Sequence, residues 1–276
     1  MKTFVWLVLA NYLLRALLAA GLFSPFVHVV EAAGVGQFPA GDRILFQPSG
    51  LYLLELLRLA GSELAALAHG SLWLLLATAL ASIVARALTY STLAQRPFEL
   101  GEVIARALRL VPGYLLIVGL VFLAQVLTLG LFYWLGSELS RPLGARSERI
   151  ADLVLVGVAL LGLFAALLLG AIAELARASL AHAGGGALSA MGRALELCQR
   201  FPVRLLSRWA GLGASGVVLV LLGAELSGLI DVSRAGGWRT AGVFTLHQLV
   251  ALALTALHTA WLAIALGAAQ SPIVSR

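Results

Sequence analysis

The sequence predicts an all-α fold: a polytopic transmembrane helical bundle of about six spans with interfacial amphipathic helices. The chain of 276 residues is 61% hydrophobic and only 12% charged, with a mean hydropathy of +0.98. This composition leaves too little polar surface to cover a soluble protein of this size. Apolar runs of about 20 residues, long enough to cross roughly 30 Å of hydrocarbon, recur along the chain, and proline and glycine separate them.

The first apolar run is too long for the apolar core of a secretory signal, and no clear small-residue cleavage site follows it, so we expect it to stay as a span. Five more runs have the length of a span, and no loop between them could hold a soluble domain. We therefore expect a single integral membrane domain over residues 1–276. The predicted spans are residues 4–24, 71–90, 112–135, 151–174, 205–230 and 240–268.

The longest loop, residues 25–70, contains a predicted amphipathic helix over 51–68. Polar side chains gather on one face of this helix and leucines cover the rest, which predicts that it lies in the membrane interface. The polar positions are Glu55, Arg58, Ser62 and His69.

The basic residues predict the orientation. With the N-terminus inside, eleven of the 19 basic residues lie on the inner side and seven on the outer side, and Arg15 lies within a span. This excess predicts that both termini are cytoplasmic. Because Lys2 is the only lysine, which is typical of a GC-rich bacterial genome, we expect a bacterial inner membrane. The inner set is Lys2, Arg86, Arg96, Arg106, Arg109, Arg177, Arg193, Arg200, Arg204, Arg208 and Arg276, and the outer set is Arg43, Arg58, Arg141, Arg146, Arg149, Arg234 and Arg239.

Two inner loops look alike, which predicts an internal repeat. The segment "ARAL" at 105–108 matches "GRAL" at 192–195, Arg86 matches Arg177, and Pro112 matches Pro202. We expect repeat 1 to cover about 71–135 and repeat 2 about 151–230. Two such parallel repeats would be related by an axis along the membrane normal.

Each repeat contains a predicted elbow helix that lies along the inner headgroups, with a proline at the bend into the next span. In the second copy, four arginines share one helical face opposite Ala194, Leu197, Cys198, Phe201 and Leu205; in the first, Glu102, Arg106 and Arg109 oppose Ile104, Leu108 and Val111. Arginines on such a face can bind anionic headgroups, although basic residues here could also serve only to orient the chain. The candidate headgroup ligands are Arg106, Arg109, Arg193, Arg200, Arg204 and Arg208.

The order of a span, "RAL" or "RAS", a short linker, "ALSAMGRALELCQRFPVRLL" and a further span resembles the membrane part of bacterial glycerophosphodiester phosphodiesterases and related multi-span proteins. The resemblance covers roughly residues 80–230 and rests on the amphipathic arginine pattern. It implies a fold of paired hairpins but no activity, because the phosphodiesterase chemistry of that family resides in a separate soluble barrel with His and Glu metal ligands.

Polar side chains within the spans are the other candidates for function, since such residues are costly in a membrane. They are Asn11, Arg15, Glu225, His247, Thr255 and His258. Two readings stay open: hydrogen bonding between helices, or the lining of a transport path. Glu174, at the end of the fourth span, is expected to pair with Arg177 at the interface.

No catalytic, cofactor or metal site is predicted, and we expect that the chain is not an enzyme. Cys198 is the only cysteine, and no cluster of Cys, His and Asp has metal-ligand spacing. The "GASG" segment around Ser215 is similar to the serine motif of rhomboid proteases, with His258 as a possible base, but the rest of that pattern is missing. Small residues that let helices approach closely explain the segment better.

These observations favour a non-catalytic membrane scaffold or accessory subunit that binds lipids, with anionic headgroups as the expected ligands. A partner membrane protein or a second copy of the chain is a further expected partner. Nucleic acid is not expected, because the basic residues are scattered among apolar segments. The alternative is a transporter of a small solute or lipid, with a polar cavity between the repeats lined by Arg15, Glu225, His247 and His258. A lipid-modifying or proteolytic enzyme is a third possibility.

Overall fold

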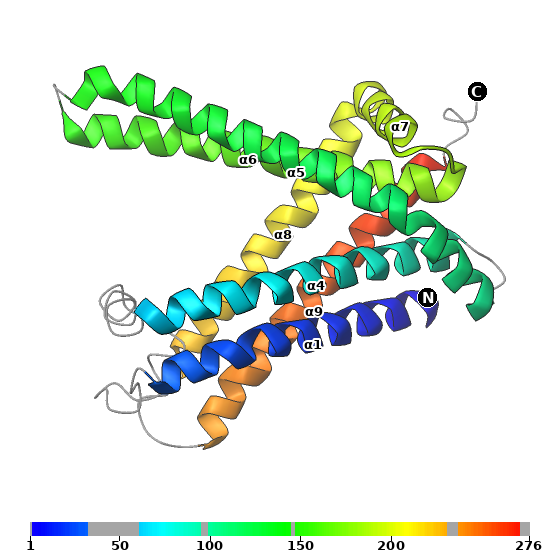
Figure 1. The fold of residues 1–276 in the computed structure, drawn as a ribbon, viewed down its shortest axis with the longest axis horizontal. Coiled ribbons are helices and arrows are strands. Elements are labelled where there is room, and N and C mark those ends of the chain that lie inside the picture. The colour runs from blue at the N-terminus through cyan, green and yellow to red at the C-terminus, as the bar shows by residue number, and fades with distance from the viewer. Residues whose placement is uncertain (1, 33–60, 95–98, 145–146, 231–236, 271–276) are drawn as a thin grey trace. The chain divides into compact units, whose positions relative to one another are not determined.

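The computed structural model describes residues 2–32, 61–94, 99–144, 147–230 and 237–270, and the regular structure of these residues is entirely helical (Figure 1). Six of their helices are long and apolar enough to cross a membrane, and only α7 is not. The all-α, polytopic class is thereby confirmed. The helices are α1 (Lys2–Ala32), α4 (Gly61–Ala94), α5 (Leu100–Gly144), α6 (Glu148–Ala183), α7 (Ala187–Arg200), α8 (Pro202–Gly228) and α9 (Gly237–Ala269).

Large apolar side chains are exposed along the middle of these helices. Leu127 on α5, Leu163 on α6 and Leu221 on α8 are examples among many. A soluble protein rarely leaves such continuous apolar surface in water, so these faces fit contact with lipid chains.

The helices are longer than the predicted spans. Helix α5 has 45 residues and is therefore about 68 Å long at 1.5 Å per residue, roughly twice the hydrocarbon thickness. The predicted interfacial helix over 51–68 falls mostly outside the described residues. Its last part, 61–68, belongs to α4, which continues through the second predicted span.

The two predicted elbows differ in their connection to the next span. Helix α7 ends at Arg200, and α8 begins at Pro202, so the predicted break is found there. Pro112 instead lies inside α5, and the prediction that the first elbow is a separate helix is wrong. A proline removes one backbone hydrogen bond and kinks a helix without always ending it, and Figure 1 shows that α5 changes direction in its N-terminal part.

The chain forms two compact units. The first unit comprises residues 1–85 and 210–260, and the second comprises residues 86–209 and 261–276. Helices α4, α8 and α9 each contribute residues to both units.

The centre of the second unit is the hairpin of α5 and α6, which lie side by side (Figure 1). Glycines allow the close approach: a Cβ atom at Gly162 would lie 2.6 Å from the Cβ of Phe132, and one at Gly113 would lie 2.5 Å from a methyl carbon of Leu180. Small residues have this role in many membrane helix pairs. The Gln125 side chain adds a hydrogen bond from its Nε2 to the Ala166 carbonyl at 2.8 Å.

The turn after α6 directs α7 back onto the hairpin. Gly184 and Gly185 have φ angles of 64° and 86°, a backbone region that glycine adopts without strain. The buried face of α7 consists of Ala187, Ala190, Ala194 and Leu197, which confirms the predicted apolar face at Ala194 and Leu197. In the first elbow the buried residues are Val103, Ala107 and Leu110, whereas the predicted apolar residues Ile104 and Leu108 are exposed.

In the first unit, α8 and α9 approach each other at glycines. A Cβ atom at Gly223 would lie 2.8 Å from a methyl carbon of Val250, and one at Gly216 would lie 3.3 Å from Leu254. A Cβ at Gly211 or Gly213 would meet nothing within 4 Å. The predicted role of the glycine-rich segment in helix packing is therefore found at Gly216 and not at those two positions.

Candidate functional site

Glu174 is the centre of a buried polar cluster in the second unit. It is only 6% exposed, and Arg177, one turn later on α6, is 5% exposed. Arg177 Nη1 lies 2.6 Å from Glu174 Oε1, and Arg86 Nε of α4 lies 3.4 Å from the same oxygen. The predicted pair of Glu174 and Arg177 is confirmed, but it is buried in protein, and a second guanidinium shares its carboxylate.

Two fully buried tyrosines complete this cluster. The Tyr90 hydroxyl donates to the Glu174 carbonyl at 3.1 Å and lies 3.4 Å from Glu174 Oε2. The Tyr114 hydroxyl donates to the Arg177 carbonyl at 3.0 Å, and the two rings meet edge to face with their centroids 6.2 Å apart. The cluster thus ties α4, α5 and α6 together at one end of α6.

The cluster contains two guanidinium groups and one carboxylate, so its net charge is positive. Arg177 Nε and the hydroxyls of Ser91 and Ser179 are buried, with no hydrogen-bond partner among the residues that the structure describes. A buried charge is tolerated where a partner and hydrogen bonds compensate its desolvation; Glu174 pairs with the buried Arg177, and Arg86, the second guanidinium at the same carboxylate, is partly exposed. Sequence reasoning missed Arg86, Tyr90 and Tyr114, although two tyrosines in the spans that flank one inner loop could have suggested them.

The six candidate headgroup arginines divide into two groups. Arg106 Nη2 donates to the Ala181 carbonyl at 2.6 Å, and Arg193 Nη2 donates to the Gly184 carbonyl at 2.8 Å. These carbonyls belong to the last turn of α6 and its cap, where cations and donors are favoured by the helix dipole. Arg106 and Arg193, which the predicted repeat aligns, therefore both stabilise the C-terminal end of α6.

The other four candidates are exposed. Arg200 pairs with Glu196 one turn earlier on α7, and Arg109 Nε makes only a long contact of 3.4 Å to the Ala105 carbonyl. Arg204 and Arg208 have no acidic partner among the described residues. A hollow of about 570 Å³ adjoins Arg106 and Arg109, with Glu102 in its wall. The elbows thus present guanidinium groups that can bind an anion at a membrane surface.

The first unit contains a cavity of about 660 Å³ between α1 and α9. Its polar lining consists of Tyr12, Arg15, Gln248 and Thr255, and alanines and Leu254 supply much of the rest. The Tyr12 hydroxyl donates to Gln248 Oε1 at 2.6 Å across the two helices. Tyr12 was missed in the sequence because a tyrosine in a span carries no charge and is common at interfaces.

The predicted intramembrane polar residues do not form one site. Arg15 and Thr255 line the cavity between α1 and α9, whereas Glu225, His247 and His258 are not among its lining residues, so this cavity does not bring together the four residues predicted to line a transport path between the repeats. Glu225 and His247 are exposed, Asn11 and His258 are half-buried, and Nδ1 of His247 lies 2.8 Å from its own helix at the Val243 carbonyl.

The serine of the "GASG" segment is engaged locally. Ser215 Oγ donates to the Gly211 carbonyl at 2.9 Å and is exposed. A hydroxyl bonded back to its own helix is a common packing feature of serines in helices. Among the residues that the structure describes, no group of three or more His, Cys, Asp and Glu side chains could hold a metal ion.

Comparisons of the chain with models of protein families, with curated proteins and with solved structures found no match.

Proposed function

We propose that this chain is a non-catalytic scaffold or accessory subunit of a bacterial inner membrane, with both termini cytoplasmic, and that it binds anionic lipid at its elbows. The observation that carries the proposal is the pair Arg204 and Arg208, which are exposed one turn apart at the start of α8 and have no acidic partner in the described ranges. By contrast, the buried Arg177 is paired with Glu174, and the half-buried Arg106 and Arg193 are bonded to carbonyls. Unpaired surface arginines beside a membrane span are suited to headgroup phosphates.

Arginines at equivalent positions of the two predicted repeats lie close together in the structure, which supports the proposed internal repeat. Arg86 and Arg177, which the sequence aligns, meet at one carboxylate, and Arg106 and Arg193 meet at one helix end. A scaffold built from two related hairpins would bring equivalent positions together near a common axis.

Counting retained lipids by native mass spectrometry tests this proposal. The wild type and the variant R200Q/R204Q/R208Q are each purified in detergent micelles that also contain phosphatidylglycerol and phosphatidylcholine with identical acyl chains. The micelles are then removed in the gas phase, and the lipids that stay bound are counted. We expect the variant to retain fewer phosphatidylglycerol molecules, with an effect on the order of 1 kcal/mol, or about fivefold in affinity, for each arginine. Retention of phosphatidylcholine should not change.

The matched control is R200K/R204K/R208K, which keeps the charges and should retain phosphatidylglycerol close to the wild-type number. Equal retention by the glutamine variant would reject lipid binding at this elbow. The arginines would then serve only to orient the chain.

A transporter is a second candidate, because a cavity of about 660 Å³ adjoins the intramembrane Arg15. A guanidinium in an otherwise largely apolar cavity suits a small amphipathic anion. This candidate requires water to reach Arg15 from one side of the membrane, whereas closely packed repeats would favour the scaffold.

A further inference from the structure

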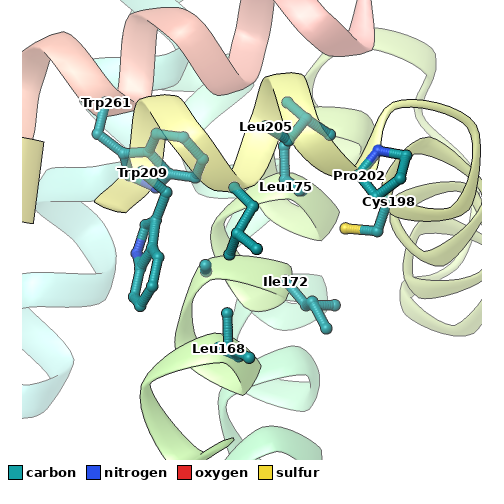
Figure 2. Close-up of a pocket in the computed structure, with 10 residues that line it drawn as sticks. Leu168, Ile172, Leu175, Cys198, Pro202, Leu205, Trp209 and Trp261 are labelled. Atoms are coloured by element: carbon teal, nitrogen blue, oxygen red, sulfur yellow. The ribbon is translucent and has the colours of Figure 1, made fainter. Parts of the chain in front are cut away.

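An apolar groove lies beside the second elbow, within the second unit (Figure 2). It has a volume of about 220 Å³, and its walls come mainly from α6 and α8. Figure 2 shows the side chains of both helices around it, with Cys198 of α7 at one end beside Pro202. The principal wall residues are Leu168, Ile172, Leu175, Pro202, Leu205 and Trp209.

The side chains that line the groove favour a hydrocarbon ligand. Apart from the indole groups of Trp209 and Trp261, the only heteroatom that a lining side chain contributes is the Cys198 sulfur. Burial raises the pKa of the Cys198 thiol, so that this group stays uncharged at neutral pH. Apolar cavities of about 150 Å³ already bind benzene, and this groove is larger. A helix would not fit in this volume, but a segment of an acyl chain would.

The helix that forms one wall of the groove also carries positive charge. Arg204 and Arg208 lie on α8 among the wall residues Pro202, Leu205 and Trp209, and both arginines are exposed. Leu205 and Arg208 are three residues apart and therefore neighbours on the helix surface. The buried Leu205 faces the groove while Arg208 faces outward, so one helix turn offers both an apolar wall and a cation.

We propose that this groove binds one acyl chain of an anionic membrane phospholipid whose headgroup is held by Arg204 and Arg208. The inference rests on the proposed lipid-binding function. It adds the position of the lipid's acyl chain, which headgroup binding alone does not specify. A phospholipid is the occupant because it joins an anionic phosphate to a hydrocarbon chain, matching the cationic and apolar halves of the site.

Photocross-linking tests the position of the acyl chain. The whole protein is placed in phosphatidylcholine bilayers with a small fraction of phosphatidylglycerol that carries a diazirine in one acyl chain. We expect cross-links on the wall segments of α6 and α8 in the wild type. They should be lost in A171W, because Ala171 lines the groove and an indole would fill it, and also in R204Q/R208Q. The matched control A159W adds the same side chain at an exposed site of α6 outside the groove and should keep the cross-links.

A wild-type measurement makes the test independent of how well A171W folds. Phosphatidylglycerol should slow the modification of Cys198 by a maleimide, and phosphatidylcholine with the same chains should not. Equal protection by both lipids would overturn the inference, because the groove would then take any surrounding chain without headgroup selection.

The results separate the two proposals. If native mass spectrometry shows arginine-dependent retention of phosphatidylglycerol but the cross-links lie outside the groove or survive in A171W, the groove inference is wrong and the proposed function stands. If retention does not depend on the arginines, the proposed function itself fails, and the inference fails with it.

Discussion

Glu174 is the residue on which the packing of the second unit depends most. Its carboxylate meets two guanidinium groups and accepts the weaker contact of the Tyr90 hydroxyl. Removing one partner from a buried ionic cluster leaves an uncompensated charge, which costs more than the cluster contributes when it is complete.

The substitution E174Q should therefore destabilise the protein by about 3 kcal/mol, because Arg86 and Arg177 would lose their common counter-charge. The matched control is E196Q, which removes a carboxylate from the exposed pair with Arg200, and surface pairs of this kind contribute about 1 kcal/mol or less. Thermal unfolding in detergent micelles, followed by tryptophan fluorescence, measures both changes. Equal losses in the two variants would show that Glu174 does not have this role.

The sequence revealed only the local half of this cluster. Glu174 and Arg177 are three residues apart on one helix, so periodicity predicts their contact. Arg86, Tyr90 and Tyr114 join them through tertiary packing, which the spacing within a single helix does not encode. The same limit applies to Arg106 and Arg193: their helical face was predictable, but not the carbonyls at the end of α6 to which they donate.

At the scale of elements, the length of the apolar runs predicted all six long helices, whereas proline did not consistently predict their ends. Pro202 stands at the first position of α8, where its missing N–H would have no partner in any case. Pro112 lies in the interior of α5, where the hydrogen bonds on both sides keep the helix continuous. Both prolines follow a similar amphipathic arginine segment, so local sequence alone did not separate the two outcomes.

The α5–α6 hairpin depends on glycine at its closest approach. In G162A the new Cβ would lie 2.6 Å from the Cβ of Phe132, so the helices would have to move apart, at a cost of about 1–3 kcal/mol. The control G157A lies on the same helix with nothing within 4 Å of the new Cβ, and it should be neutral or stabilising by up to about 1 kcal/mol. Thermal unfolding of the two variants checks this, and a G162A protein as stable as G157A would contradict the packing described.

At the scale of the whole molecule, composition and the recurring apolar runs were enough to predict a multi-span membrane protein, because a chain that is 61% hydrophobic and 12% charged has too little polar surface for a soluble protein of this size. The organisation into two units was not predictable. Three long helices contribute to both units, and a helix that passes from one unit to the other shows no composition change at the boundary.

The central claim is that the second elbow and its arginines lie against the cytoplasmic headgroups. Its most direct test is the side on which a cysteine next to α7 can be labelled. Gly186 is exposed, has an ordinary negative φ and has nothing within 4 Å of a new Cβ, so G186C in a C198A background should fold normally. Gly144, at the other end of the α5–α6 hairpin, offers the same freedom, and G144C is the matched site.

In intact cells, a membrane-impermeant maleimide should label G144C and leave G186C unmodified until the cells are opened. This outcome follows from the predicted topology, which places eleven basic residues on the inner side and seven on the outer side. Labelling of G186C from outside, with protection of G144C, would contradict the claim, because Arg200, Arg204 and Arg208 would then face away from the cytoplasmic leaflet.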